Sequence, residues 1–263
     1  MLRVLSYHSR AGAVLLALAV LAPLAASPPR AGAAVWVAPS QLRIEQALAE
    51  LNYLPLRFVP TAPVASTGPQ VQAGRFVWRW VAPAALRATW RAGRANPIET
   101  GAVMTFERVH ALAITSAPTT AMEHQLLADL ADHRLAPLSY NDVYVSTTTP
   151  ERVWLFVNGR SVFTSLANTG VAASPTAPGT YPVYLRYVSQ TMSGTYPWGG
   201  TYSDPGIPWV SYFHGGDALH GFVRAGYGWP QSLGCVETPP ANARVLWPHT
   251  PIGTLVTVAV ARP

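Results

Sequence analysis

The chain contains a single cysteine, Cys235, which lies in the stretch SLGCVETPP at residues 232–240. Two histidines, His214 and His220, precede it by 21 and 15 residues. The thiolate is the nucleophilic form of cysteine, but an ordinary thiol with a pKa of about 8.5 is mostly protonated at neutral pH. A neighbouring imidazole can take that proton and later return it to a leaving group. The two residue types together therefore indicate acyl transfer through a covalent thioester.

The neighbours of the cysteine favour a reactive thiol over a thiol that pairs with another chain or is buried and inert. We predict from the spacing that His220 is the general base, with His214 as the alternative. Gly234 lets the backbone approach a substrate carbonyl, and the N–H groups of Gly234 and Cys235 could hold the oxyanion. We expect Cys235 Sγ and a ring nitrogen of His220 to lie within about 4 Å of each other.

The same histidines permit a second interpretation, because His214, Asp217 and His220 form an H-x-x-D-x-x-H pattern. The two glycines inside this pattern disfavour a helix, and no fourth ligand is evident, so we expect neither a metal nor a cofactor. Arg224 lies between the histidines and the cysteine, where it could meet a substrate carboxylate or remain in a solvated loop. Tyr212 could line a cleft or pack in the core.

From Val143 onward the sequence has β character. The stretch RVWLFVNGRSVFTSLA (152–167) predicts a hairpin that turns at Asn158-Gly159. Further strands are predicted at residues 180–188, 207–213 and 253–260. We therefore expect a compact, mostly antiparallel β domain whose loops are long enough to build a cleft.

The part before residue 143 is predicted to be mainly helical. Apolar spacing indicates helices within residues 41–56, 83–93, 101–112 and 121–135, with a short strand at 76–80. TSAPTTA (115–121) has the composition of a linker. We therefore expect an α+β multidomain chain with a small helical domain at 35–113, a linker and helix at 114–140, and a catalytic domain at 141–263.

The N-terminus has the pattern of an export signal. Arg3 and Arg10 precede an apolar run at residues 13–26, and the small-residue sequence AGA follows at residues 31–33. The run is too short for a comfortable transmembrane helix. We therefore expect residues 1–33 to be a signal peptide and the protein to be secreted to the cell wall, with an uncleaved anchor as the alternative.

Composition narrows the range of functions. All 18 basic residues are arginine, so Schiff-base lysine and Ser–Lys mechanisms are excluded. The formal net charge of +6 would fall to about +3 on loss of Arg3, Arg10 and Arg30 with the signal. A mild positive charge suits an anionic envelope polymer. It is too weak and too scattered to indicate nucleic acid binding.

The region around the cysteine resembles the L,D-transpeptidase catalytic domain of the YkuD family. His220-Gly221, followed by the cysteine of an S-x-G-C box, is similar to the family's HG and S-H-G-C signature. NTGVAASPTAPGTYPVY (168–184) is similar to its T-G-x-x-x-x-x-T-P-x-G-x-Y segment, and PIGTLVTV (251–258) to its closing strand. The resemblance implies a YkuD-like β-sandwich, and residues 35–113 are similar to peptidoglycan-binding helical modules.

The resemblance implies an enzyme that acts on the stem peptides of peptidoglycan. Cys235 would attack the carbonyl of the third stem residue and expel the terminal D-alanine. The acyl group would pass to the side-chain amine of a diamino acid, giving a 3→3 cross-link, or to water. The resemblance also implies that His220 is the base, that the Gly221 carbonyl orients it, and that Ser232 and Gly234 belong to the cysteine box. Carbapenem β-lactams are expected to inhibit such an enzyme.

Two positions depart from the family pattern. Leu233 replaces the histidine of the box, which is not the family's base, and Glu237 stands where the family commonly has Arg or Asn. Glu237 brings a negative charge to a site that handles carboxylates, although it could attract an acceptor ammonium. The predicted substrate-binding residues are Tyr212, His214, Arg224 and Glu237. The alternative function is a catalytically degenerate cell-wall protein that binds peptidoglycan.

Overall fold

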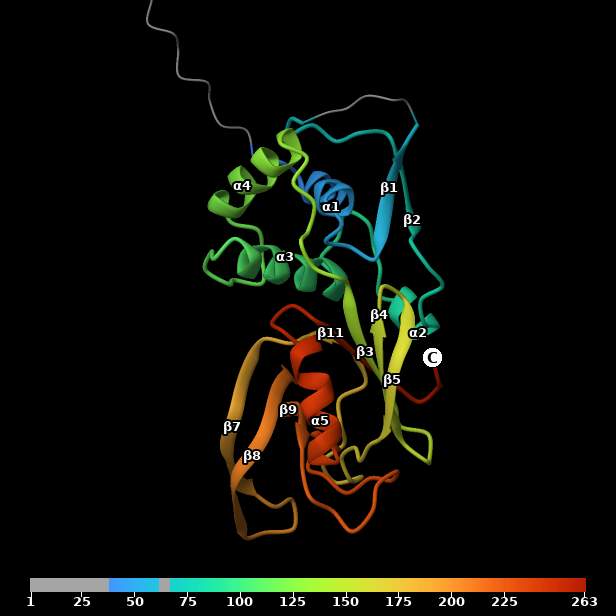
Figure 1. The fold of residues 1–263 in the computed structure, drawn as a ribbon, viewed down its shortest axis with the longest axis vertical. Coiled ribbons are helices and arrows are strands. Elements are labelled where there is room, and N and C mark those ends of the chain that lie inside the picture. Colours follow the sequence, from blue (N-terminus) through green and yellow to red (C-terminus); the bar gives the residue numbers. More distant parts are fainter. Residues whose placement is uncertain (1–37, 62–66) are drawn as a thin grey trace, which may run out of the picture. The chain divides into compact units, whose positions relative to one another are not determined.

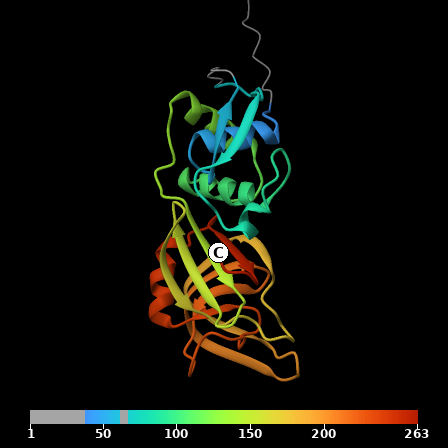
Figure 2. The same ribbon diagram turned by 90° about the vertical axis from the view of Figure 1, so that its right-hand side faces the viewer.

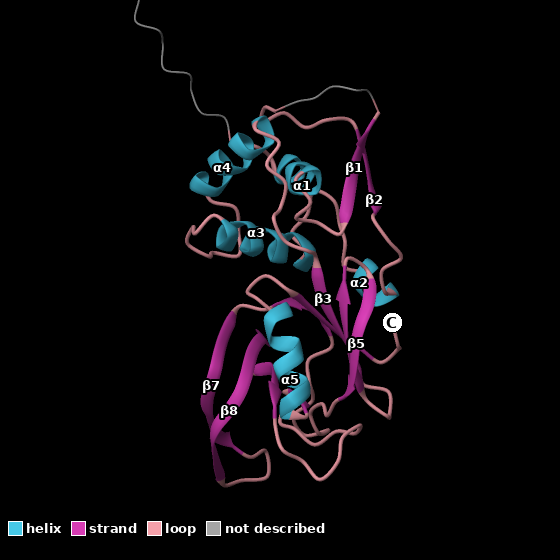
Figure 3. Cartoon of the chain, in the orientation of Figure 1, coloured by secondary structure: helices cyan, strands magenta, loops and turns pink. Residues whose placement is uncertain are grey.

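The computed structural model of the protein describes residues 38–61 and 67–263, so the predicted signal peptide lies outside the described residues. The described residues belong to one compact unit. Helices predominate before residue 132 and strands after residue 140 (Figures 1 and 3). Within the described residues, no helix is long and apolar enough to cross a membrane.

The first half of the chain contains four helices and one strand pair in its described residues. They are α1 (Gln41–Glu50), β1 (Leu56–Pro60), β2 (Gly74–Trp78), α2 (Ala84–Arg87), α3 (Pro97–Val109) and α4 (Thr120–Ala131). Ser40, Asn96 and Thr119 cap α1, α3 and α4, because each side chain accepts a hydrogen bond from a backbone N–H of the first turn. The predicted helix at 83–93 is wrong in length, since α2 ends at Arg87 and Thr89 Oγ1 then donates to the Leu86 carbonyl.

This half is organised around one apolar core. Leu48 of α1, Phe106 of α3 and Leu126 of α4 are fully buried in it together with Leu54. Helix α4, which is predicted together with the linker at 114–140, therefore packs into the same core as α1 and α3. The antiparallel pair β1–β2 packs its aromatic side chains on the same core, so the region is not purely helical.

The second half contains two sheets. Its elements are β3 (Asn141–Ser146), β4 (Arg152–Val157), β5 (Arg160–Leu166), β6 (Gly179–Pro182), β7 (Leu185–Thr195), β8 (Thr201–His214), β9 (Asp217–Gly221), β10 (Val236–Thr238), α5 (Pro240–Leu246), the 3-10 helix η1 (Trp247–His249) and β11 (Leu255–Ala259). The five-stranded sheet has the order β5-β4-β3-β11-β6, and the four-stranded sheet β10-β9-β8-β7. Figure 2 shows β3, β4 and β5 side by side. Pairing is antiparallel except for β11 with β3 and β10 with β9, so the predicted mostly antiparallel fold is confirmed.

The hairpin predicted at Asn158-Gly159 is present between β4 and β5. Both turn residues have positive φ, 49° and 74°, as a two-residue hairpin turn of the I′ kind requires. Asn158 Oδ1 also accepts a hydrogen bond from Tyr140 N at 3.0 Å. The inward side chains of this sheet, including Val145 and Val256, are fully buried in a second core.

The single strand predicted at 180–188 is wrong, because the chain changes sheets there. Val183 N donates to Thr254 O at 2.8 Å, beside the five-stranded sheet. The next residue, Tyr184, donates its N–H to Tyr212 O at 2.9 Å, beside the four-stranded sheet. Strands β6 and β7 therefore belong to different sheets and carry the chain from one to the other.

Candidate active site

Cys235 lies in a tight loop just before β10. Ser232 Oγ donates to Cys235 O at 2.5 Å and accepts from Gly234 N at 3.3 Å. Gly234 has a φ of +114°, and a Cβ added there would lie 2.3 Å from the Asp217 carboxylate. Glycine is therefore required at this position both by backbone conformation and by the approach of a side chain. The Gly234 N–H donates to Ser232 Oγ within the loop in this structure, so a hydrogen bond from it to an oxyanion stays a prediction.

The segment after β5 supports this loop. Asn168 and Glu237 exchange both backbone hydrogen bonds, each at 2.9 Å, and Val171 N donates to Ser232 O at 2.9 Å. The buried Glu151 carboxylate accepts from both the N–H and the hydroxyl of Thr169 at 2.7 Å. The T-G…T-P segment noted in the sequence is therefore the structural support of the cysteine loop.

His220 lies on β9, directly beside β10. The parallel register pairs Leu219 with Val236 and His220 with Glu237. Because side chains alternate along a strand, His220, Glu237 and Cys235 lie on the same face of the sheet. The thiol and the imidazole both line one cavity.

The His220 ring is held in one orientation. It is 3% exposed, and its Nδ1 lies 3.1 Å from Gly221 O. A carbonyl can only accept, so Nδ1 carries the hydrogen and Nε2 keeps a free lone pair. The contact of His220 with the Gly221 carbonyl is thus present, and the ring is set up to take a proton at Nε2.

Both side chains favour their neutral forms. Burial, together with the charges of Asp217 and Glu237 and against a backbone N–H of Ala218 that lowers it, raises the pKa of Cys235 to about 12. Burial also lowers the pKa of His220. The thiol donates to Gly216 O at 3.7 Å, and no hydrogen bond joins it to His220 in the described residues. Direct contact between thiol and imidazole stays a prediction.

The negative charge of Glu237 is compensated by Arg224. Arg224 Nε and Nη2 donate to the two Glu237 oxygens at 2.8 and 2.7 Å, which is a bidentate ion pair. Glu237 is 4% exposed, and the guanidinium also lies 4.5 Å over the Phe222 ring. Arg224 therefore lies in a loop with its side chain 30% exposed and is held by Glu237, so the departure at Glu237 is matched by a partner from the same cavity wall.

The cavity around the thiol has a volume of about 710 Å³. Among the predicted residues, it is lined by Tyr212, His220, Arg224, Ser232, Cys235 and Glu237, and Leu233 lines it too. Two further carboxylates, Asp204 and Asp217, also face it, and Asp217 accepts a hydrogen bond from Ala177 N at 3.0 Å.

His214 is not among the lining residues. Its ring packs on Tyr181 at 4.3 Å, and its Nδ1 lies 3.6 Å from Asp217 Oδ2. The structure therefore does not bring His214 to the thiol. In the described part of the chain, no group of three or more His, Cys, Asp or Glu side chains is arranged to hold a metal ion.

Aromatic side chains from the β7–β8 hairpin form one wall of this cavity. Tyr196 and Trp198 stack at 5.2 Å with an interplanar angle of 17°, and Tyr202 packs against Tyr196 at 5.2 Å. Trp198 is 66% exposed, which leaves one face of its ring open. The signal in the sequence that could have indicated this wall is the group of aromatic residues on either side of the Trp-Gly-Gly turn.

One family model matches the part of the chain that carries this site. The family model of the L,D-transpeptidase catalytic domain (YkuD) matches residues 141–258. A search of curated proteins gave no match.

Several solved structures are similar to part of the chain. The catalytic domain of the E. faecium L,D-transpeptidase is 22% identical, with 47% of this chain and 99% of that chain covered and a TM-score of 0.41. An L,D-transpeptidase from Mycobacterium smegmatis is 19% identical, with 45% and 58% covered and a TM-score of 0.39. L,D-transpeptidase 3 from Mycobacterium tuberculosis, solved with a faropenem-derived adduct, is 19% identical, with 45% and 60% covered and a TM-score of 0.39. The chain thus spans less than two thirds of these two mycobacterial proteins.

Proposed function

Because residues 141–258 match the family model of the YkuD L,D-transpeptidase catalytic domain, we propose that the protein is a cysteine transpeptidase acting on peptidoglycan stem peptides. The observation that carries the proposal is that Cys235, just before β10, and His220, on the neighbouring β9, line one cavity, with Nδ1 of the histidine tied to Gly221 O at 3.1 Å. This arrangement leaves Nε2 as the base that a protonated thiol needs.

The first half of the reaction forms a thioester. As Cys235 Sγ bonds to the carbonyl carbon of the third stem residue, its proton moves to His220 Nε2. The tetrahedral intermediate collapses when the bond to the terminal D-alanine breaks, and His220 returns the proton to the leaving amine. We expect the N–H of Cys235 to donate a hydrogen bond to the oxyanion.

The second half resolves the thioester by the reverse path. The attacking group is the side-chain amine of a diamino acid on a second stem, or water, and it loses a proton to His220 as the C–S bond breaks. The amine yields a 3→3 cross-link, and water yields a shortened stem. Asp204 and Asp217 make the cavity wall acidic, which favours approach of a cationic amine.

Acylation is tested with a carbapenem and intact-protein mass spectrometry. We expect one stable adduct on the wild-type protein and none on Cys235→Ala. His220→Gln should still fold, because it keeps a polar side chain of similar size, but should acylate far more slowly. Incubation with a muropeptide tetrapeptide then identifies the acceptor from the product masses.

The second candidate is a wall-binding protein with a degenerate site, which Leu233 near the thiol motivates. It predicts retention of peptidoglycan binding with no carbapenem adduct and no muropeptide turnover. A folded wild-type protein that gives that combination would replace the enzymatic proposal.

Export to the cell wall is part of the same proposal, because the substrate lies outside the membrane. It rests on the leader pattern at residues 1–33. N-terminal sequencing of the exported protein should find a start just after Ala33, and recovery of the protein only inside the cell would contradict it.

A further inference from the structure

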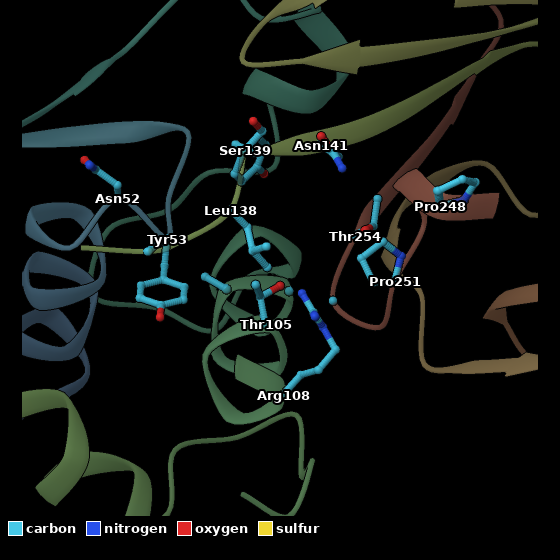
Figure 4. A pocket seen from close by; sticks show the side chains of 15 residues that line it. Asn52, Tyr53, Thr105, Arg108, Leu138, Ser139, Asn141, Pro248, Pro251 and Thr254 are labelled. Carbon is cyan, nitrogen blue, oxygen red and sulfur yellow. The ribbon is translucent and has the colours of Figure 1, made fainter. Parts of the chain in front are cut away.

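A second cavity lies between helix α3, the segment 138–141 and the loop 248–254 (Figure 4). We call it the junction cavity, and its volume is about 250 Å³. It shares no lining residue with the cavity around Cys235. Apolar groups such as Leu138 and Pro251 alternate around it with polar ones such as Asn52, Thr105 and Ser139.

The junction cavity contains a cation without a counter-charge. Arg108, near the end of α3, is the one charged side chain among its fifteen lining residues, all of which are described. Its guanidinium makes a single hydrogen bond, from Nε to Ile252 O at 3.2 Å, and takes part in none of the ion pairs of the described residues. The nearby Asp142 alternates to the other face of β3 and does not line the cavity. The two terminal nitrogens of Arg108 are therefore available to a ligand.

A second guanidinium adds to the positive potential. Arg186 of β7 lies 3.5 Å over the Trp247 ring and donates to Trp247 O, at the start of the loop that walls the cavity. Its Nε is buried and has no hydrogen-bond partner. Burial, and then the charge of Arg108, lower the pKa of Arg186 to about 10. Two mutually repelling cations without a carboxylate partner favour an anion between or beside them.

We propose that the junction cavity binds a small organic carboxylate, such as an N-acylated amino acid or a peptide carboxyl terminus. The carboxylate accepts hydrogen bonds from the terminal nitrogens of Arg108. The apolar part of the ligand lies against Leu138 and Pro251. The inference does not depend on the proposed reaction, because the cavity is separate from the thiol.

The test uses two probes that differ in charge alone, N-acetylglycine and N-acetylglycinamide. Titration of the purified protein, followed by calorimetry or by NMR shifts, should give a dissociation constant at least about tenfold lower for the carboxylate, since a charge-assisted hydrogen bond contributes about 1.5–3 kcal/mol. Arg108→Gln should abolish this preference. Arg160→Gln removes an exposed positive charge at the β4–β5 turn and should retain it. Equal affinity of the wild type for both probes, or equal loss in both variants, would overturn the proposal.

A second variant guards against failure of Arg108→Gln to fold. Leu138 is 49% exposed at the rim of the cavity, so Leu138→Trp can fill the cavity without removing a charge or a core contact. The variant should unfold at the same midpoint as the wild type, which shows that it is folded. Its dissociation constant for N-acetylglycine should be at least about tenfold higher. Unchanged binding in the folded Leu138→Trp protein would show that the ligand sits elsewhere and would end the proposal.

Discussion

Replacing Glu237 by glutamine should make the Cys235 thiol more reactive. Glu237 is one of the charges that raise the pKa of Cys235, and Arg224 compensates it through two hydrogen bonds of 2.8 and 2.7 Å. Glu237→Gln removes the negative charge of the carboxylate and leaves the positive charge of Arg224 without a partner. The lost repulsion and the remaining positive charge both favour the thiolate, so the pKa of Cys235 should fall below its value of about 12.

The size of the effect follows from the strand geometry. Cys235 and Glu237 are two residues apart on one face, which places them about 7 Å apart. Two unit charges at that distance interact by about 2 kcal/mol at an effective dielectric constant of about 20. Solvent in the open cavity screens part of this, so the thiolate fraction should rise on the order of tenfold.

Alkylation by iodoacetamide measures that fraction, because the reagent is neutral and reacts with the thiolate. At about pH 8 the pseudo-first-order rate should be about tenfold higher in Glu237→Gln than in the wild type. Arg224→Gln leaves the carboxylate uncompensated and should react no faster than the wild type. Asp132→Asn, a half-exposed acid at the end of α4, is the control and should change nothing. An unchanged or slower rate in a folded Glu237→Gln protein would refute the electrostatic argument.

Four further outcomes are expected. The alkylation rate of wild-type Cys235 should rise about tenfold per pH unit up to about pH 10, because its pKa is raised to about 12, and a plateau near about pH 8.5 would contradict this. Trp198→Ala should raise KM for a disaccharide-peptide about tenfold at unchanged kcat and unfolding midpoint, since the ring is 66% exposed, and an unchanged KM in a product assay would count against a substrate contact. Gly234→Ala should lower the free energy of unfolding by about 1–3 kcal/mol in urea titrations, and clearly more than Gly199→Ala, which has a φ of +95° but open space around it. Burial raises the pKa of Asp142 to about 7, so the contribution of this residue to folding stability is most favourable below about pH 4 and is lost as the pH rises to about 7. In thermal unfolding, Asp142→Asn should therefore stabilise the protein more at about pH 8 than at about pH 4.

Local patterns predicted much of the second half of the chain. Asn158-Gly159 specified its hairpin because both residues tolerate positive φ, as the turn requires. The spacing of His220 and Cys235 identified two residues that line one cavity, since β9 and β10 are neighbours with only one loop between them. The placement in one cavity of two residues that are close in sequence could therefore be predicted from the sequence.

The features that the sequence did not predict depend on contacts between distant segments. The chain changes sheets between Val183 and Tyr184 because their N–H groups bond to different segments. Val183 N donates to Thr254 O, 71 residues further along the chain, and Tyr184 N donates to Tyr212 O, 28 residues further along. The Arg224–Glu237 pair forms only because the loop after β9 folds back on β10. Neither apolar periodicity nor charge spacing reports such pairings, because both are set by the register of the sheets.

The neutral state of the thiol and the imidazole constrains how the site works. An imidazolium at His220 would be buried, and burial together with the charge of Arg224 lowers the pKa of the ring, although Glu237, its neighbour across the strand pair, acts in the opposite direction. A thiolate at Cys235 would face the carboxylates of Asp217 and Glu237. Separating the proton before a substrate arrives is therefore unfavourable at both ends, so proton transfer must accompany attack on the carbonyl. This arrangement keeps the thiol slow toward adventitious oxidants and electrophiles, because these react with the thiolate, and it leaves the thiol reactive toward an acyl group held beside Nε2, as the proposed reaction requires.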